Sequence, residues 1–163
     1  MTLDRAAVQD LLAEYGARLD AEQYDEWLDL FAAECRYQVV PRDNHQRGLP
    51  AALIFCDSRA MLEDRIRALR EANKFNIHSD RHLISLPRVT PTLSSPAGGG
   101  GSGGGIVEAP FAVYQTDQEG ETRLFATGLY RDRLEPEGGV LKIRDKLVLL
   151  DTFAVPTLLA TPL

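Results

Sequence analysis

The chain has 163 residues, of which 44% are hydrophobic and 26% charged, and its formal net charge at pH 7 is -6. This length fits one domain, 1-163, that hides roughly 70% of the surface its unfolded chain would expose. The basic residues are scattered, which argues against nucleic acid and anionic membranes as partners. No stretch approaches the roughly 20 apolar residues of a membrane span, and the N-terminus lacks an apolar signal core. We therefore expect a cytoplasmic protein.

Two helices are predicted at the start of the chain. An apolar residue recurs at helical spacing from Val8 to Leu19, so a helix is expected from about Asp4 to Asp20, with Asp4 as its cap. Tyr24, Trp27, Leu28 and Phe31 repeat this spacing and predict a second, short helix. Such a short helix is stable only when it packs against something, so its aromatic face must be covered.

A strand and a third helix follow. Cys35, Tyr37 and Val39 alternate with polar residues, which is typical of a half-buried strand, and Pro41 ends it. A polar loop is expected over 42-50. The third helix begins after Asp57 or Ser58 and ends near Asn73. Its inward residues are Met61, Leu62, Ile66 and Leu69, and Glu63 and Arg67 are spaced to form an ion pair.

The rest of the chain predicts a sheet. Four strands are expected, at Arg81-Val89, Ile106-Thr116, Glu121-Leu134 and Val140-Asp151, with turns at 117-120 and 135-139. Strands joined by short turns form an antiparallel meander, and helices that precede such a sheet cover one of its faces, which is an α+β architecture. A sheet of this length is expected to curl.

Two further segments stand apart by composition. The glycine-rich stretch 94-105 is predicted to be a flexible hairpin loop between two strands. A phosphate-binding loop would require Lys-Ser or Lys-Thr after the glycines and then a helix, whereas Ile106 opens a strand. The segment 152-163 is apolar and has no charged residue, so it must be covered by its own domain or by another chain.

The chain offers few metal ligands. His78 and His82 are four residues apart, but His82 belongs to the predicted strand Arg81-Val89, and a third ligand would have to be His45 or a distant carboxylate. Two cysteines, Cys35 and Cys56, cannot hold an iron-sulfur cluster, which requires four ligands. Both are expected to be reduced thiols in the core. We therefore expect no metal and no redox cofactor in this chain.

One pair of residues could carry acid-base chemistry. Asp20 ends the first helix and His82 begins a strand, and a carboxylate that orients an imidazole in a closed pocket is a plausible catalytic pair. The alternative is that Asp20 ends a helix in solvent and His82 is a hydrogen-bonded residue of the wall. No Gly-x-Ser-x-Gly turn supports acyl transfer.

Four segments carry a resemblance to a known family over nearly the whole chain. They are the run Tyr24-Phe31, the helix Met61-Ile66, the strand Arg81-Ile84 and the closing Lys142-Asp151. In this order and spacing the sequence resembles the small (β) subunits of bacterial aromatic-ring-hydroxylating dioxygenases. The segments 43-45, 48-49, 65-73 and 158-163 are most similar to the small subunits of terephthalate-type and related benzoate-class enzymes.

The resemblance implies a fold, a role and partners. The family fold is a cone, shared with scytalone dehydratase and nuclear transport factor 2, in which a strongly curved antiparallel sheet wraps around helices. The family's large (α) subunit holds a Rieske [2Fe-2S] cluster and a mononuclear iron and carries out cis-dihydroxylation. The β subunit forms a trimer within an α3β3 hexamer and is a non-catalytic support. The interface candidates are then Tyr24, Trp27, Phe153, Leu158, Leu159 and Leu163.

The resemblance leaves two other functions open. Asp20 and His82 occupy the positions of a catalytic aspartate and histidine in scytalone dehydratase, but Leu19 stands where that enzyme has a tyrosine. A free-standing dehydratase, isomerase or cyclase that uses Asp20 and His82 is one alternative, and a module that binds a small molecule is the other. The glycine-rich loop is also longer than the family pattern.

Overall fold

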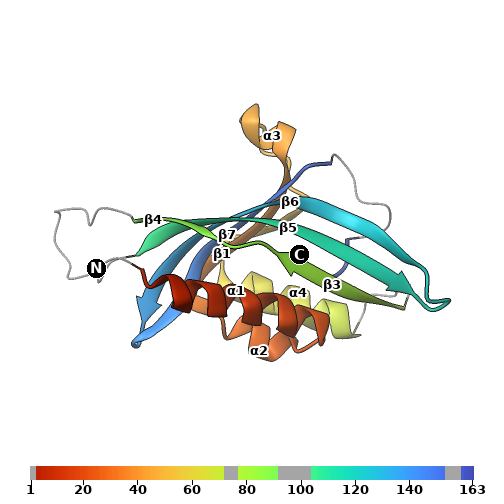
Figure 1. Ribbon diagram of the computed structural model, residues 1–163, viewed down its shortest axis with the longest axis horizontal. Coiled ribbons are helices and arrows are strands. Elements are labelled where there is room, and N and C mark those ends of the chain that lie inside the picture. Colours follow the sequence, from red (N-terminus) through yellow and green to blue (C-terminus); the bar gives the residue numbers. More distant parts are fainter. Residues whose placement is uncertain (1–2, 72–76, 92–103, 153–158) are drawn as a thin grey trace.

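The computed structural model describes residues 3-71, 77-91, 104-152 and 159-163. A single curled sheet arches over three helices (Figure 1), and the predicted α+β class is confirmed. In chain order the elements are α1 (Arg5–Asp20), α2 (Tyr24–Leu28), β1 (Phe31–Pro41), α3 (Arg42–Gln46), β2 (Ile54–Cys56), α4 (Arg59–Glu71), β3 (His78–Ile84), β4 (Arg88–Pro91), β5 (Gly105–Asp117), β6 (Thr122–Glu137) and β7 (Val140–Leu150).

The helices agree with the sequence in position and differ in detail. The Asp4 side chain accepts a hydrogen bond from the Ala6 N–H, as predicted for a cap. Helix α2 ends at Leu28, three residues earlier than expected, because Phe31 already begins β1. In α4, Glu63 pairs with Arg59 at 2.9 Å and not with Arg67 as predicted. Met61, expected inside, is 42% exposed.

The strands form one sheet in the order β2-β1-β7-β6-β5-β3, and β4 also pairs with β5. The run from β3 to β7 is antiparallel, as the meander predicted. The sheet is nevertheless mixed, because β1 lies parallel to β7, with Tyr37 opposite Lys146 and Val39 opposite Val148. The alternation of apolar residues gives no strand direction, so the sequence could not show this pairing.

A proline and two glycines explain two further differences between the predicted and the observed strands. The strand predicted over 81-89 is divided into β3 and β4, because Ser85 to Pro87 leave the sheet and Pro87 has no N–H to donate to it. The turn between β6 and β7 contracts to Gly138 and Gly139, which both have positive φ, as a two-residue turn requires. The short elements α3 and β2 were not predicted.

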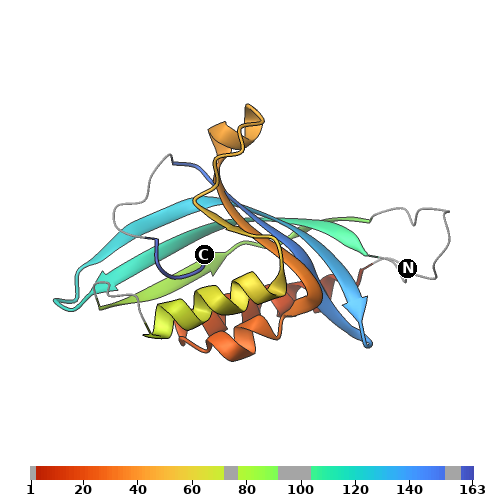
Figure 2. The ribbon, with the colours of Figure 1, turned by 180° about the vertical axis from the view of Figure 1, so that it is seen from behind.

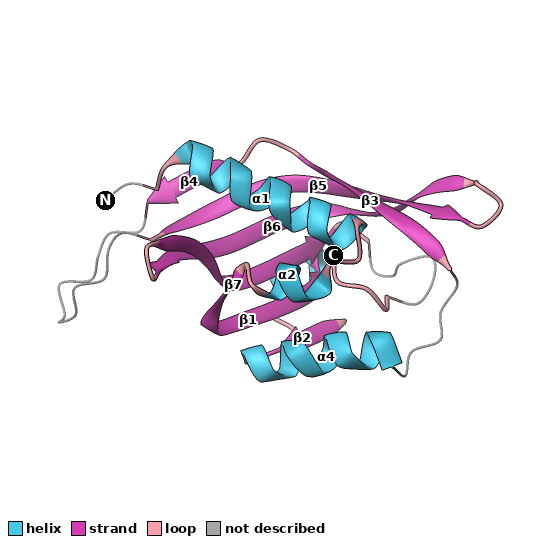
Figure 3. Cartoon of the chain, turned by 90° about the horizontal axis from the view of Figure 1, so that it is seen from below, coloured by secondary structure: helices cyan, strands magenta, loops and turns pink. Residues whose placement is uncertain are grey.

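Three register shifts curl the sheet. The extra residues lie on β1 between Phe31 and Arg36, on β6 at Phe125 opposite Val113/Tyr114, and on β7 at Arg144 opposite Arg133/Leu134. An extra residue on one strand bends that strand and increases its twist. The sheet therefore closes around α1, α2 and α4, which lie on its concave face (Figures 2 and 3). We call the space between this face and the helices the cone interior.

Helix α3 projects from the opposite side of the sheet (Figure 1). It has no buried residue, and the chain after it keeps Leu49 48% and Leu53 45% exposed. Across the described ranges, no helix has both the length and the apolar content needed to cross a bilayer.

A substitution at Gly128 tests the close contact between β6 and β7. A Cβ at this position would lie 2.0 Å from the Leu149 carbonyl oxygen and 3.0 Å from Phe111 Cε1. Backbone cannot yield as a flexible side chain does, so Gly128→Ala should lower the free energy of unfolding by at least about 2 kcal/mol in urea titrations. Thr127→Ala, on the half-buried neighbour, should change it by less than about 0.5 kcal/mol. Equal midpoints for the two variants would refute this contact.

Candidate functional site

The structure brings the predicted pair Asp20 and His82 together. The end of α1 lies beside β3, and Asp20 Oδ1 is 2.6 Å from His82 Nδ1. The His82 backbone N–H also donates to both carboxylate oxygens, each at 3.1 Å. The side chains are nearly buried, with exposed fractions of 9% for Asp20 and 1% for His82. Gly16 permits this approach, because a Cβ there would already lie 3.3 Å from His82 Cβ.

The geometry of this pair suits an anchor better than a catalyst. A carboxylate on Nδ1 orients an imidazole for proton transfer at Nε2, provided that a substrate can reach Nε2. His82 Nε2 is buried and has no hydrogen-bond partner among the described residues. The three contacts of Asp20 with His82 instead tie the last turn of α1 to β3, so they hold the helix on the sheet.

An open groove of about 820 Å³ passes close to this pair. It runs between α1 and the point where the chain leaves β3, and its wall is mostly apolar, including Ala13, Ala17, Leu83, Leu86 and Pro87. Asp20 and His82 contribute to the lining, but the buried Nε2 adds no surface to it. The groove therefore presents a mostly apolar surface, and the Nε2 atom of His82 is not exposed in it.

The polar centre of the cone interior is an ion pair that the sequence did not reveal. Lys146 Nζ lies 2.9 Å from Asp132 Oδ2, and both side chains are 0% exposed. The ammonium also lies 3.5 Å from the ring centroid of Tyr130 and 4.0 Å from that of Tyr15. Burial raises the pKa of Asp132 and lowers that of Lys146, and their mutual attraction opposes both shifts. Two aromatic faces thus help to hold a cation without water.

Aromatic rings fill the space around this ion pair. Tyr15 lies 5.7 Å from both Trp27 and Tyr130, measured between ring centroids, and Tyr130 stacks on Phe111 at 4.1 Å. Burial raises the pKa of Tyr15, Tyr37 and Tyr130, so their hydroxyls stay protonated. The interior is therefore a packed core rather than a chamber lined by free acids and bases.

Residues 159-163 enter this interior beside the sheet (Figure 2). The Leu163 side chain is 0% exposed. Its carbonyl oxygen accepts hydrogen bonds from Tyr15 Oη at 2.5 Å and Tyr37 Oη at 3.1 Å. Its N–H donates to Tyr37 Oη at 2.8 Å. The apolar tail is thus covered by its own domain at this point.

The interface candidates are placed differently from the expectation. Tyr24, Trp27 and Leu163 are 7%, 0% and 0% exposed and belong to the core of this chain. Their burial within the chain leaves almost no surface for a partner subunit. Leu159 is half-buried, and Phe153 and Leu158 lie outside the described residues. The apolar pattern of the sequence identified these residues, but it could not show whether they pack in the core of one chain or at a contact between subunits.

The described residues contain no group of three or more His, Cys, Asp or Glu that could hold a metal ion. His78 Nε2 lies 3.5 Å from Asp80 Oδ2, while His82 pairs with Asp20 and His45 belongs to the projecting α3. Cys35 and Cys56 are free and buried, and burial raises the pKa of Cys35 to about 11. This protonated thiol is a poor nucleophile.

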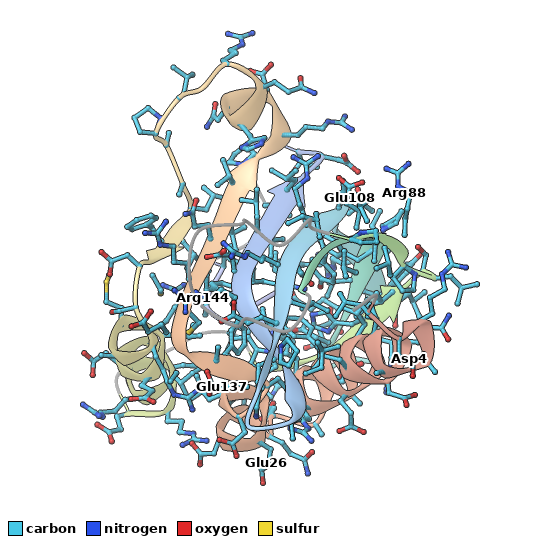
Figure 4. The ribbon with its side chains drawn as sticks, turned by 90° about the vertical axis from the view of Figure 1, so that its left-hand side faces the viewer. Asp4, Glu26, Arg88, Glu108, Glu137 and Arg144 are labelled. Carbon is cyan, nitrogen blue, oxygen red and sulfur yellow. The ribbon has the colours of Figure 1, made fainter. Side chains whose placement is uncertain are left out.

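Charges on the outer surface are largely paired with one another. Glu108 lies between Arg88 at 2.5 Å and Arg131 at 2.8 Å, and Figure 4 shows Arg88 and Glu108 close together at the surface. These hydrogen bonds from the arginines lower the pKa of Glu108. Arg144 similarly reaches Glu34 at 2.9 Å. Such exposed pairs contribute little to stability.

A family model described as "Ring hydroxylating beta subunit" matches residues 16-157. The chain belongs to this family, which confirms the resemblance read from the sequence. Its members are subunits of oxidoreductase complexes and are not the catalytic subunit.

Individual relatives agree with this assignment. The beta 1 subunit of the terminal oxygenase component of terephthalate 1,2-dioxygenase from Comamonas sp is 34% identical over 151 residues, which is 93% of each chain. A crystal structure from Novosphingobium aromaticivorans, assigned as the β subunit of an aromatic-ring-hydroxylating dioxygenase, superposes with a TM-score of 0.83 at 39% identity. The match covers 98% of this chain and 96% of that one.

A second solved structure is informative about the fold alone. A protein from the same organism, assigned as a scytalone dehydratase, superposes with a TM-score of 0.64 at 14% identity, and the match covers 90% of this chain and 83% of that one. The predicted cone-shaped fold, related to that of scytalone dehydratase, is therefore confirmed.

Substitutions at the buried ion pair test its role in the cone interior. Lys146→Met would leave Asp132 buried without its cation and should lower the free energy of unfolding by about 3-5 kcal/mol. The double variant Lys146→Met/Asp132→Leu removes both charges and should be clearly more stable than the single variant. Chemical denaturation measures both. A double variant as unstable as the sum of its two single variants would show that the charges act independently.

Proposed function

We propose that this chain is the structural β subunit of an aromatic-ring-hydroxylating dioxygenase and supports a large α subunit in the cis-dihydroxylation of a benzoate-type compound. The observation that carries the proposal is the packed cone, in which Tyr15, Trp27 and Leu163 fill the space where a substrate would have to bind. Membership of the family of ring-hydroxylating β subunits implies that the partner is a large α subunit. An aromatic carboxylate as substrate is supported by the relative named for terephthalate.

The division of labour in this proposal follows from the available ligands. A Rieske cluster and a mononuclear iron together need several Cys, His and carboxylate ligands in close groups. The described residues offer no such group, so we assign both centres to the α subunit. A cytoplasmic location is part of the proposal, and the free thiols of Cys35 and Cys56 agree with it.

The proposed assembly is a trimer of this chain within an α3β3 hexamer. Several large apolar side chains are exposed, and they lie on the outer strands β2 and β3, in the chain directly after β3 and on the projecting segment after α3. Burying such side chains against another chain is favourable. They replace the buried aromatic residues as candidates for subunit contacts: Leu49 48%, Leu53 45%, Phe55 53%, Leu83 54% and Leu86 79% exposed.

The alternative of a free-standing enzyme rests on Asp20 and His82, which do form a close pair. It requires that Nε2 of His82 reach a substrate, and this atom is buried. The alternative of a small-molecule module would use the apolar groove along α1. No further observation favours the free-standing enzyme or the small-molecule module over the supporting role.

Separate purification of the two subunits tests the proposed function. The isolated chain should form a trimer in light-scattering measurements, contain no stoichiometric iron and oxidise no benzoate-type compound. A co-expressed α subunit from the same source should turn over its substrate only when this chain is present. His82→Gln should leave this activation within about twofold if the folded trimer is retained, because the imidazole acts within the fold. An α subunit that is soluble and fully active alone would refute the proposal.

A further inference from the structure

The strongest feature outside the proposed partner contacts is the way residues 159-163 are held inside the cone. Leu163 is bound through three hydrogen bonds to two tyrosine hydroxyls, as described above. Thr161 Oγ1 donates to Asp80 Oδ2 at 3.2 Å, and Arg65 Nη2 donates to the Leu159 carbonyl oxygen at 3.2 Å. Ala160 is 4% exposed. Five separate polar contacts to Leu159, Thr161 and Leu163 thus position the segment.

The groups that hold this segment come from elements far apart in the chain. Tyr15 lies on α1, Tyr37 on β1, Arg65 on α4 and Asp80 on β3. Two helices and two strands therefore each contribute one side chain to the binding of the segment. Such convergence of a few polar groups on an apolar space is the usual arrangement of a small-molecule site.

We propose that the cone interior is a binding site whose occupant is the chain's own segment 159-163, and that in its absence the site accepts a small apolar acid or carbonyl compound. The ligand class follows from what Leu163 presents there. Its branched apolar side chain is fully buried, and its oxygen accepts two hydroxyl hydrogen bonds. A branched or aromatic body that carries one carbonyl or carboxylate oxygen offers the same two features.

Covalent attachment explains why the segment would exclude free ligands. A tethered group competes at an effective concentration in the millimolar range, so a weak external ligand cannot displace it. The contacts also link α1 to β1, and therefore the segment holds the helix layer on the sheet. This inference concerns the isolated chain and does not depend on any large subunit.

The test uses the full-length chain with Leu163→Asp, which places a charge in the fully buried position and should expel the segment. The matched control is Leu124→Asp, the same substitution at a leucine that is 50% exposed on β6. Hydrogen exchange followed by NMR should show the amide at position 163 exchanging at least about 100-fold faster in Leu163→Asp than in the control. Equal protection in the two variants would overturn the proposal.

Binding is then measured with a pentapeptide of the sequence Leu-Ala-Thr-Pro-Leu, which corresponds to residues 159-163. Calorimetry should detect saturable one-to-one binding to Leu163→Asp and none to the wild type or to Leu124→Asp. The probe 4-methylpentanoate, which has the branched chain and an acceptor oxygen, should compete with the peptide. Folded Leu163→Asp that binds neither peptide nor probe would refute the site.

A second variant keeps the proposal falsifiable if Leu163→Asp does not fold. Tyr37→Phe keeps the ring and removes the hydroxyl that both donates to and accepts from Leu163. The Leu163 amide should then exchange roughly 10-fold faster, as expected for the loss of a buried hydrogen bond, while amides in the β5-β6 hairpin change little. Unchanged exchange at Leu163 would contradict the proposed attachment.

Discussion

The placement of Tyr15 is the constraint on which the rest of the cone depends. This residue lies on the buried face of α1, and its ring contacts Trp27 of α2, Phe31 of β1 and Tyr130 of β6. The same ring faces the ammonium of Lys146, and the hydroxyl binds the carbonyl of Leu163. One side chain therefore connects α1 and α2 with strands of both halves of the sheet and with Leu163.

This arrangement explains why a fold that also serves enzymes can act here as a support. In a cone-shaped enzyme the space between the helices and the sheet must stay open to a substrate. In this chain, aromatic rings, a desolvated ion pair and Leu163 occupy that space. The Asp20-His82 pair keeps the geometry of an acid-base site, but its free nitrogen faces no accessible space. Function is then left to the outer surface, where apolar side chains are exposed.

Much of the fold could be predicted from local patterns. The helical spacing from Val8 to Leu19 and the alternation within β5 and β6 gave the main elements, because periodicity reports which face of an element is buried. The parallel pairing of β1 with β7 could not be predicted, since it joins segments about a hundred residues apart and leaves no periodic signal. The short elements α3 and β2 lack enough residues to show a period.

The candidate site was only partly accessible to sequence reasoning. Asp20 and His82 could be paired as a possible acid-base pair and through the resemblance to scytalone dehydratase, and they do meet. The pair Asp132 and Lys146 was missed, because a charged residue in an alternating strand is normally assigned to the solvent face. A usable signal was present, since both occupy positions in phase with the inward residues Tyr130 and Val148. Trp27 and Leu163 were recognised as apolar and expected at a subunit interface, whereas both are buried in the core of their own chain. Composition alone does not show whether an apolar residue is covered by its own chain or by another.

The emission of Trp27, the single tryptophan of the chain, provides the most direct test of the filled interior. This indole is 0% exposed and lies within the aromatic cluster. If the interior is filled, the emission of the wild-type protein should be blue-shifted, should resist quenching by acrylamide and should not change when benzoate-type acids are added up to millimolar concentrations. A saturable change in this emission with one-to-one stoichiometry would show instead that the interior is open to ligands.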